Sequence, residues 1–339
     1  MDSNLLVQRI ERRAHALRST RRFFEDRGFL EVDAPQLVPA TTTEPHIDPL
    51  AVDVRVRLES PPERRFLHTS PELALKRIVA AGLDRVYCLG HVFRDGERGE
   101  RHLPEFTLLE WYRRGQSLPA LVQDTTELVR DLSVALCGTT RLQQVDGAII
   151  DVALSPDVYS VDELFHRYAS VDLRRALEKM AQGDDEALVR AVREAGHALR
   201  EGADFEDAFF HVMGTRVEPH IGRDRLCVVE RWPRQMAVLA RGSDDDPLFA
   251  ERFEIYAGGL ELANAFDELT DPTEQRRRFA ADNHLRRALG KEALPIDELF
   301  LRSLADLPPT VGIALGFDRV LMLLFGAAHI EDVVPVPFR

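Results

Sequence analysis

Apolar residues recur at a helical spacing through residues 5–27. The positions that share one face of such a helix are Leu6, Ile10, Ala14, Leu17 and Phe24. Gly28 follows where a helix of this kind ends. Residues 29–35 read as an extended segment, because Pro35 suits a strand edge or a break in a strand. The pattern predicts an amphipathic first helix that leads into a short strand.

The next segment predicts a helix and two strands. Residues 70–82 have a helical pattern that closes at Gly82. Residues 86–93 and 105–112 are rich in aromatic and β-branched side chains, which favour strands, and the residues between them are highly charged. This arrangement predicts an antiparallel hairpin with a long polar loop.

The second half of the chain continues the mixture of helices and strands. Residues 116–225 are predicted to be mainly helical, and we find no recognisable chemistry in them. Strand patterns return at 252–256 and 260–262, and a helical pattern follows near 273–289. We therefore expect the region around 116–225 to be an insertion in a sheet-containing domain.

The C-terminal pattern is a strand followed by a helix. Residues 311–317 form the strand, Asp318 can cap the helix and Gly326 can close it. Neither a repeat nor a long flexible linker marks a domain boundary. We predict one α+β domain over residues 1–339, with an antiparallel β-sheet flanked by helices.

Composition narrows the class of protein. The chain has 339 residues, of which 45% are hydrophobic and 30% charged, as in a globular protein with a large core and not a disordered one. No apolar run approaches the roughly 18 residues that span a bilayer. The three cysteines, Cys88, Cys137 and Cys227, are odd in number and far apart, which predicts neither a disulfide framework nor a structural zinc site. With no secretory segment at the N-terminus, we expect a cytoplasmic protein.

The net charge of the chain and the absence of the common nucleotide-binding and hydrolase motifs argue against further classes of protein. The formal charge of −13 disfavours nonspecific attraction to nucleic acid. The chain contains neither G-x-x-x-x-G-K-[ST] nor G-x-G-x-x-G, and neither G-x-S-x-G nor H-E-x-x-H. A phosphate-binding site in this protein must therefore use another architecture.

Two glutamates flank a predicted turn. A two-residue turn at Ala257 and Gly258 would place Glu254 opposite Glu261, and directly opposed like charges destabilise a sheet unless a cation lies between them. Carboxylates of this kind suit Mg²⁺ that carries nucleotide phosphates. The alternative is a slipped register that leaves one glutamate in solvent.

The charged loop and the last helix each contain an arginine with two interpretations. Arg94 lies in a loop where a solvated charged turn is the usual interpretation, and Arg319 could belong to a helix surface. Taken in chain order, however, residues 29–35, 93–106 and 312–319 resemble motifs one, two and three of the class II aminoacyl-tRNA synthetases. Residues 70–72, 104–112 and 261–268 are similar to signatures of the lysyl branch, and the resemblance covers nearly the whole chain.

The resemblance implies an ATP site and a metal site. Arg94 would hold the α-phosphate and the amino-acid carboxylate, His102 would lie near the β- and γ-phosphates, and Arg319 would clamp the γ-phosphate. Phe106 would stack on adenine. The implied catalytic residues are Arg94 and Arg319, and the implied ATP-binding residues are Arg94, Asp95, Gly96, His102, Leu103, Phe106, Glu261, Leu262, Gly316 and Arg319. In this context Glu254 and Glu261 become the expected Mg²⁺ ligands.

It also implies a site for a diamino acid. Ser70 and Glu72 would face the backbone amino group, Asn264 the carboxylate, and Glu110, Tyr112 and Glu268 the terminal ammonium. The implied substrate-binding residues are Ser70, Pro71, Glu72, Glu110, Tyr112, Asn264, Glu268 and Ala314. A buried ammonium needs carboxylates and hydrogen-bond acceptors, which this set supplies. Ala314 stands where lysyl-tRNA synthetases usually have glycine, and a methyl group there can reshape the pocket.

The sequence departs from the family pattern at three points. Gly96 and Leu103 stand where the family commonly has a glutamate and an asparagine, so adenine contacts would use backbone groups or Glu97. No N-terminal OB-fold anticodon domain is expected, because the motif-one segment lies within the first 35 residues. A catalytic core of this length resembles the ligases of this family that attach (R)-β-lysine or lysine to a lysine side chain of elongation factor P.

This resemblance implies the partners of the protein. We expect elongation factor P as protein substrate, ATP and Mg²⁺ as co-substrate and metal, and a homodimer formed through the motif-one helix and strand. No tRNA partner is expected. Two alternatives stay open: a tRNA-dependent aminoacylating or tRNA-modifying enzyme, and a non-catalytic sensor that binds lysine or ATP. A basic groove would favour the first alternative, and loss of the arginines or paired glutamates would favour the second.

Overall fold

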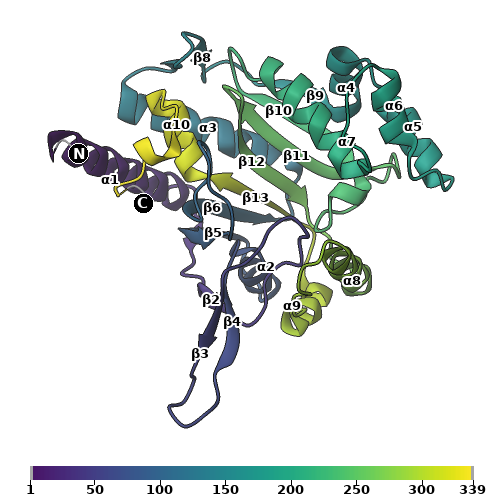
Figure 1. Cartoon of the computed structure of the whole chain (residues 1–339). Coiled ribbons are helices and arrows are strands. Elements are labelled where there is room, and N and C mark those ends of the chain that lie inside the picture. The colour runs from purple at the N-terminus through teal and green to yellow at the C-terminus, as the bar shows by residue number, and fades with distance from the viewer. Residues whose placement is uncertain (1–2, 337–339) are drawn as a thin grey trace.

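The computed structural model describes residues 3–336 and is built on a central sheet (Figure 1). Within the described residues this sheet has eight strands, in the order β1-β5-β6-β13-β12-β11-β10-β9. Its strands are β1 (Leu30–Glu31), β5 (Arg85–Phe93), β6 (Glu105–Arg114), β9 (Asp157–Ser160), β10 (Cys227–Pro233), β11 (Phe249–Ala257), β12 (Leu260–Asp267) and β13 (Thr310–Gly316). The inner pairs are antiparallel, whereas β1 pairs with β5 and β9 pairs with β10 in parallel. The sheet is therefore antiparallel through its inner strands, as predicted, and its two edge strands make it mixed.

Two smaller sheets extend the structure. A three-stranded sheet contains β2 (Leu37–Val38), β4 (Glu63–Leu67) and β3 (Ala51–Val54), and it projects away from the main sheet in Figure 1. The strands β7 (Arg141–Gln143) and β8 (Ile149–Asp151) form a short pair.

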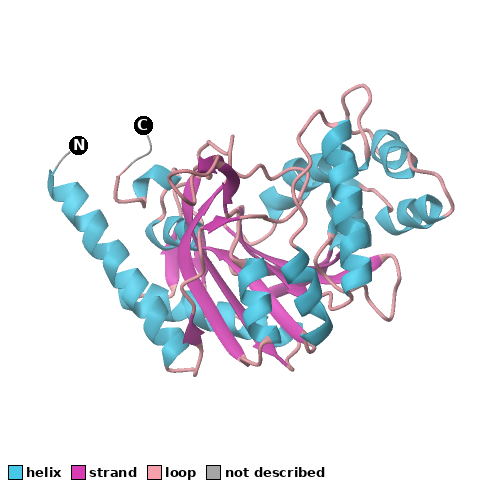
Figure 2. Ribbon diagram, turned by 90° about the horizontal axis from the view of Figure 1, so that it is seen from below, coloured by secondary structure: helices cyan, strands magenta, loops and turns pink. Residues whose placement is uncertain are grey.

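Helices pack around the central sheet, as Figure 2 shows. They are α1 (Ser3–Glu25), α2 (Glu72–Ala80), α3 (Leu118–Cys137), α4 (Val161–Ala169), α5 (Leu173–Ala181), α6 (Ala187–Glu194), α7 (Phe205–Val212), α8 (Pro272–Ala288), α9 (Glu298–Ser303) and α10 (Phe317–Phe325). Short helical turns are η1 (Met213–Val217), η2 (Glu218–His220), η3 (Arg234–Met236), η4 (Leu304–Asp306) and η5 (Ile330–Asp332). None of the helices in residues 3–336 is long and apolar enough to cross a membrane. The fold is α+β, as the sequence predicts.

The hydrophobic core is divided among the helical layers. The largest cluster joins α1, α3 and α10 to the sheet, and in it the ring of Phe24 stacks on Tyr87 with centroids 4.7 Å apart. A second cluster packs α4 to α7 on β10 and β11, and a third packs α2, α8 and α9 near β5. The sheet thus has helices anchored at several places, which fixes the strands that carry the candidate site.

Several predicted elements are confirmed. The strands β5 and β6 are antiparallel, with Val86 opposite Tyr112 and Phe93 opposite Glu105. The helices expected at 70–82 and 273–289 correspond to α2 and α8. Residues 116–225 contain α3 to α7 and also the short strands β7, β8 and β9.

The first helix departs from its predicted apolar face. Phe24 is buried as expected, but Ile10 is 46% exposed, and the neighbouring Leu5 and Val7 are exposed as well. The buried face in the middle of α1 instead includes Arg13, whose guanidinium lies 2.5 Å from a carboxylate oxygen of Asp318. The N-terminal half of α1 therefore presents apolar residues to solvent in the single chain.

Asp318 does not cap the last helix. Gly316 occupies the N-cap position, and Asp318 is buried in the first turn, where its second carboxylate oxygen accepts from the backbone N–H of Thr107 at 2.8 Å. The expectation fails because long-range partners on α1 and β6 satisfy this carboxylate. Gly326 closes the helix in the left-handed region, with φ of 60°, as predicted.

The turn between β11 and β12 also differs from the expectation. The two turn residues are Gly258 and Gly259, with φ of 59° and 72°, and Ala257 pairs with Leu260. Both positions need the left-handed region, which glycine adopts without strain. Together with a bulge between Ile255 and Tyr256, this register places Glu254 opposite Asn264, so the predicted pairing of the two glutamates is wrong.

Candidate active site

A cavity of about 570 Å³ lies where β12, β13, the β5–β6 loop and the start of α10 meet. Of the residues predicted from the sequence, those that line it are Arg94, His102, Leu103, Phe106, Glu254, Glu261, Leu262, Asn264, Ala314, Gly316 and Arg319. The cavity therefore brings together the segments that resemble motifs two and three.

Arg94 stands at the base of the charged loop. Its backbone N–H donates to Pro104 at 2.9 Å, its guanidinium carbon lies 5.0 Å from the ring centre of Phe106, and an Nη lies 3.8 Å from Glu97. Burial lowers the pKa of Arg94, although an arginine remains charged under these conditions. Its Nε is buried without a hydrogen-bond partner among residues 3–336. A partly buried guanidinium with an unused, buried Nε–H donor is suited to an anionic ligand.

The tip of the loop behaves differently from its base. Residues 98–101 are exposed, as expected for a solvated charged turn. Asp95 and Gly96 are also exposed and do not line the cavity, and the backbone N–H of Asp95 donates to Asp48 at 2.7 Å. The structure thus separates these two expected ATP-binding residues from Arg94, His102 and Phe106.

Arg319 joins the last helix to the loop. One Nη donates to the carbonyl oxygen of Glu261 at 2.8 Å and lies 3.3 Å from its carboxylate, and the other lies 2.6 Å from Nε2 of His102. Because arginine can only donate, Nε2 of His102 must accept. Burial, and then the charge of Arg319, lower the pKa of His102, which keeps the imidazole neutral at pH 7.

Glu254 and Glu261 face the same cavity despite their offset register. Burial first, and then the charge of Glu261, raise the pKa of Glu254 to about 7. Arg252 forms an ion pair with Glu254 at 2.5 Å, and Arg319 is the partner of Glu261. Two carboxylates that repel each other beside an arginine-lined cavity have the oxygen donors that Mg²⁺ prefers.

A metal at this position would need ligands from outside the protein. Within residues 3–336 no group of three or more His, Cys, Asp or Glu side chains is arranged to hold a metal. Mg²⁺ commonly binds through one or two carboxylates plus substrate phosphates, so Glu254 and Glu261 fit that mode.

Asn264, Ala314 and Glu110 form a row across three adjacent strands. Ala314 on β13 pairs with Asn264 on β12 and with Glu110 on β6. Directly paired residues point to the same face of a sheet, so this row runs from the open cavity to a buried polar cluster.

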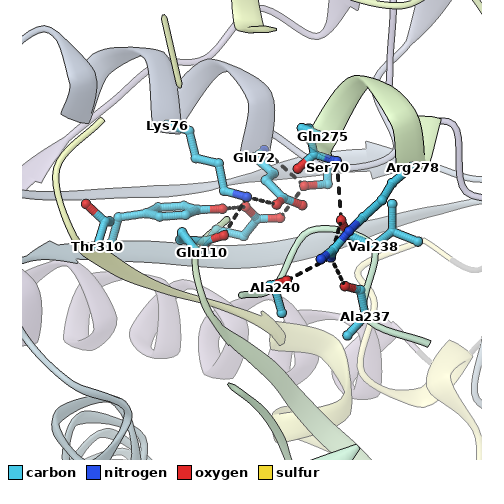
Figure 3. Close-up of polar contacts among 12 residues, drawn as sticks. Ser70, Glu72, Lys76, Glu110, Ala237, Val238, Ala240, Gln275, Arg278 and Thr310 are labelled. Atoms are coloured by element: carbon cyan, nitrogen blue, oxygen red, sulfur yellow. Dashed lines mark hydrogen bonds and ion pairs between the residues drawn. The ribbon is translucent and has the colours of Figure 1, made fainter. Parts of the chain in front are cut away.

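The buried cluster contains carboxylates beside one lysine (Figure 3). Ser70 donates to Glu110 at 2.5 Å and Tyr112 donates to its other oxygen at 3.2 Å. Lys76 forms ion pairs with Glu72 and Glu268. Burial raises the pKa of Glu110 to about 8, and the charge of Glu72 adds to this effect. Burial likewise raises the pKa of Glu268 to about 8.

Pro71 has a different place from the other residues predicted to bind the amino acid. It is the N-cap of α2 and lines a second cavity of about 240 Å³ together with His68 and Cys88. Its carbonyl oxygen accepts from the backbone N–H groups of Ala74 and Leu75. Pro71 therefore shapes the start of the helix that carries Glu72 and Lys76.

The cavity also contains residues that the sequence analysis missed. Arg252 donates to Asn264 at 3.1 Å in addition to its ion pair with Glu254. Arg252 lies two residues before Glu254 on the same strand, so both side chains point to the same face of the sheet. This spacing is visible in the sequence and could have identified Arg252.

A further set of residues that line the cavity could not be recognised from any local sequence pattern. Glu44 and His46 come from a loop, Glu206 from α7 and Asp282 from α8. His46 forms an ion pair with Glu206, and Thr43 donates to Asp282 at 2.8 Å. Burial raises the pKa of Asp282 to about 7. These residues are far apart in the sequence, so only the fold brings them together.

The comparisons with known proteins agree over nearly the whole chain. The family model described as "tRNA synthetases class II (D, K and N)" matches residues 2–339. A protein of Hamiltonella defensa is 36% identical over 336 residues, which are 99% of this chain and 95% of the relative. A protein of Proteus mirabilis is 36% identical over 333 residues, 98% of this chain and 95% of the relative. A protein of Pectobacterium carotovorum is 38% identical over 330 residues, 97% and 94% respectively. All three are named elongation factor P–(R)-β-lysine ligase.

Proposed function

Since the chain belongs to the family of class II tRNA synthetases (D, K and N), we propose that it is an ATP-dependent ligase for elongation factor P. It activates (R)-β-lysine, or lysine, as an aminoacyl-adenylate and transfers it to a lysine side chain of that factor. The names of its relatives support this substrate pair. The observation that carries the proposal is the row Asn264–Ala314–Glu110, which connects an arginine-lined cavity to a buried carboxylate cluster. Binding of ATP beside a diamino acid requires such a combination, because the phosphates are anionic and the amino groups are cationic.

Activation would begin with ATP in the open cavity. Arg94 would bind the α-phosphate and the amino-acid carboxylate, and would stabilise the charge that develops at phosphorus. His102 and Arg319 would bind the outer phosphates, while Phe106 would stack on adenine. Gly316 would let the backbone approach the nucleotide, and Leu103 and Leu262 would complete the walls. Asp95 and Gly96 would contribute only if the loop closed over the nucleotide.

Mg²⁺ would be held by Glu254 and Glu261 together with phosphate oxygens. When bound, the metal neutralises phosphate charge and orients the polyphosphate. The carboxylates would exchange their present arginine partners, Arg252 and Arg319, for this cation and for phosphate.

The diamino acid would bind along the row toward the buried cluster. Asn264 would face its carboxylate, Ser70 and Glu72 the amino group near the carboxylate, and Glu110, Tyr112 and Glu268 the terminal ammonium. A buried ammonium is stable only where carboxylates balance its charge. The carboxylate oxygen would attack the α-phosphorus in line, so that an O–P bond forms, the bond from the α-phosphorus to the bridging oxygen breaks and pyrophosphate leaves. Positioning of the two reactants would accelerate this step, and no nucleophile on the enzyme is needed.

Transfer would complete the reaction. The neutral amine of the acceptor lysine attacks the carbonyl carbon of the mixed anhydride, a C–N bond forms, and the C–O bond to AMP breaks. The amine proton passes to solvent and AMP leaves. Because ATP and a translation factor are both cytoplasmic, we propose that the enzyme acts in the cytoplasm.

We also propose that the protein is a homodimer with one catalytic domain per chain. The match of one family model over residues 2–339 supports a single catalytic domain, and the helices α4 to α7 between β9 and β10 support an insertion around 116–225. Exposed Leu5, Val7 and Ile10 on α1, and Leu30 on the edge strand β1, support pairing of the motif-one segment with a second copy. Light scattering should give a dimer at micromolar concentration and a smaller particle for Ile10→Asp. A monomeric wild-type protein would contradict this proposal.

One incubation tests the function. The protein, ATP and Mg²⁺ are combined with α-lysine or (R)-β-lysine and with either elongation factor P or tRNA, and the products are read by mass spectrometry. We expect one added lysyl or β-lysyl group on elongation factor P and an unmodified tRNA. Aminoacylated tRNA would favour the tRNA-dependent alternative, and binding without any product would favour a sensor.

A further inference from the structure

Lys76 is a buried cation that the reaction scheme above does not use. It is 1% exposed, and its ammonium contacts Glu72 on the preceding turn of α2 and Glu268, which follows β12. The distance between Nζ and the carboxylate of Glu268 is 2.5 Å. Figure 3 shows the side chain of Lys76 pointing into the carboxylate cluster from α2. A lysine is almost never buried to this extent without a specific electrostatic partner.

The elements packed around Lys76 supply mainly negative charge. Glu72 comes from α2 itself, Glu110 and Tyr112 come from β6, and Glu268 directly follows β12. The nearby Arg278 of α8 is engaged with the carbonyl oxygens of Ala237, Val238 and Ala240 and with Glu274. Within the part of the chain that the structure describes, Lys76 is therefore the one cation paired with these carboxylates.

Glu268 has capacity for a further partner. It is 2% exposed, and apart from the ion pair with Lys76 neither of its carboxylate oxygens has a hydrogen-bond partner among residues 3–336. Gln275 is also buried, and its amide oxygen has no partner in the same range. Buried acceptors without donors are costly, so a ligand that brings ammonium groups would satisfy this site.

We propose that Lys76 is a positioning residue for the amino-acid substrate, which holds the side chains of Glu72 and Glu268 in place through its two ion pairs. Glu72, Glu110 and Glu268 carry three negative charges when ionised and Lys76 carries one positive charge, which leaves two negative charges for a substrate with two ammonium groups. The inference rests on the proposed function and adds to it the residue that sets the charge of the pocket.

The pKa values support this role. Burial alone lowers the pKa of Lys76, but the charges of Glu268 and Glu72 outweigh burial and raise it, so the ammonium stays protonated. Burial raises the pKa of Glu268, and Lys76 is the main influence that opposes this rise. Without Lys76 the carboxyl groups of Glu110 and Glu268 would be more protonated near pH 7, and a diammonium substrate would have to displace more protons on binding.

Lys76→Met tests the proposal, because methionine fills a similar volume without the charge. In ATP–pyrophosphate exchange we expect the KM for the preferred lysine isomer to rise about tenfold or more near neutral pH. The KM should fall again as the pH rises, because the remaining carboxyl groups ionise. The kcat and the KM for ATP should stay within about threefold of wild type. Lys179→Met is the matched control, because Lys179 is an exposed residue of α5.

Several outcomes would overturn the proposal. An unchanged KM would mean that Lys76 does not act on the substrate. A lower KM would mean that Lys76 competes with the substrate for the carboxylates. A lower kcat at unchanged KM, or the same KM ratio at every pH, would indicate a purely structural role. If the wild-type protein shows no exchange with any lysine isomer, the proposed function fails instead.

A measurement on the wild-type protein covers the case in which Lys76→Met does not fold. The chain has only three lysines, Lys76, Lys179 and Lys291, so NMR of ¹³Cε-labelled lysine gives a resolvable signal for each. We expect unlabelled lysine or β-lysine to shift the Lys76 signal and leave the Lys179 signal unchanged. A saturating substrate that leaves the Lys76 signal in place would overturn the proposal.

Discussion

Arg319 and His102 are in direct contact although 217 residues separate them: an Nη of Arg319 lies 2.6 Å from Nε2 of His102. The contact joins the start of α10 to the loop between β5 and β6. Two groups that would bind the same phosphates therefore hold each other before any nucleotide arrives, which reduces the cost of ordering them.

Arg94→Ala should abolish most of the activation step. Its partly buried guanidinium has an unused Nε–H donor, so we expect the loss of Arg94 to remove a charge contact in the transition state. We expect kcat/KM for ATP–pyrophosphate exchange to fall by about 10² or more. Arg167→Ala is the control, because Arg167 is exposed on α4. Exchange at the wild-type rate in Arg94→Ala would refute the assignment of this arginine.

His102 should make ATP binding depend on pH. Its pKa is lowered in the free protein by burial and Arg319, and phosphates placed beside it would raise that pKa. A group whose pKa is higher in the complex favours binding at low pH, and this benefit is lost as the pH rises through the higher value. The dissociation constant for ATP should therefore decrease when the pH is lowered from about 8 to about 6. The decrease should be up to tenfold for each unit by which the pKa of His102 is higher in the complex than in the free protein. His102→Gln should flatten this dependence, and equal slopes in both proteins would contradict the assignment.

Gly312→Ala should damage the amino-acid pocket more than the fold. A Cβ at this position would lie 2.3 Å from Oε1 of Glu268 and 2.3 Å from the ring of Tyr112. Overpacking of this kind costs about 1 to 3 kcal/mol and displaces the side chains involved. We expect a KM for lysine isomers raised at least tenfold and a lower melting temperature. In Gly214→Ala the added Cβ meets nothing within 4 Å, so this variant should behave as wild type in both assays.

Ala314→Gly should alter the choice between isomers. Ala314 sits between Asn264 and Glu110 in the sheet, so its methyl group borders the path of the diamino acid. Removing it should shift the ratio of kcat/KM toward α-lysine by a factor that corresponds to about 1 to 3 kcal/mol at most. Side-by-side exchange assays with both isomers measure the ratio. An unchanged ratio would show that the methyl group does not contribute to the discrimination between the two isomers.

Asp282→Asn should stabilise the protein at neutral and alkaline pH. Burial raises the pKa of Asp282 to about 7, so the folded state binds its proton more tightly than the unfolded state, whose pKa is about 4. Asp282 therefore does not lower the free energy of unfolding below about pH 4, and it lowers that free energy progressively as the pH rises from about 4 to about 7. The amide keeps an acceptor for Thr43 and avoids the buried charge, so we expect a gain of about 2 to 4 kcal/mol near pH 8 and little gain near pH 4. Thermal unfolding of both proteins at the two pH values is the measurement, and a gain that is equal at both would argue against titration of Asp282.

The sequence alone determined the elements that depend on local patterns. The antiparallel pair β5 and β6, the helices α2 and α8, and the strand β13 followed by α10 all follow from periodicity and turn residues. The motif residues Arg94, His102 and Arg319 were recognisable for the same reason, because their neighbours in the chain identify them. Local backbone preference and short motifs are encoded within a few residues, and no distant partner is needed to interpret them.

Tertiary structure decided the features that depend on distant partners. The sequence predicted a cap at Asp318, but contacts to Arg13 and Thr107 bury its carboxylate. The register of β12 against β11 depended on a bulge and on which two residues form the turn, and a shift of one position changes every opposing pair. Glu72 and Lys76 are visible as an ordinary helical pair, but only folding adds Glu268 and removes water from all three. The charge of a pocket is a sum over side chains from separate elements in a medium of low dielectric, and no local segment of the sequence contains that sum.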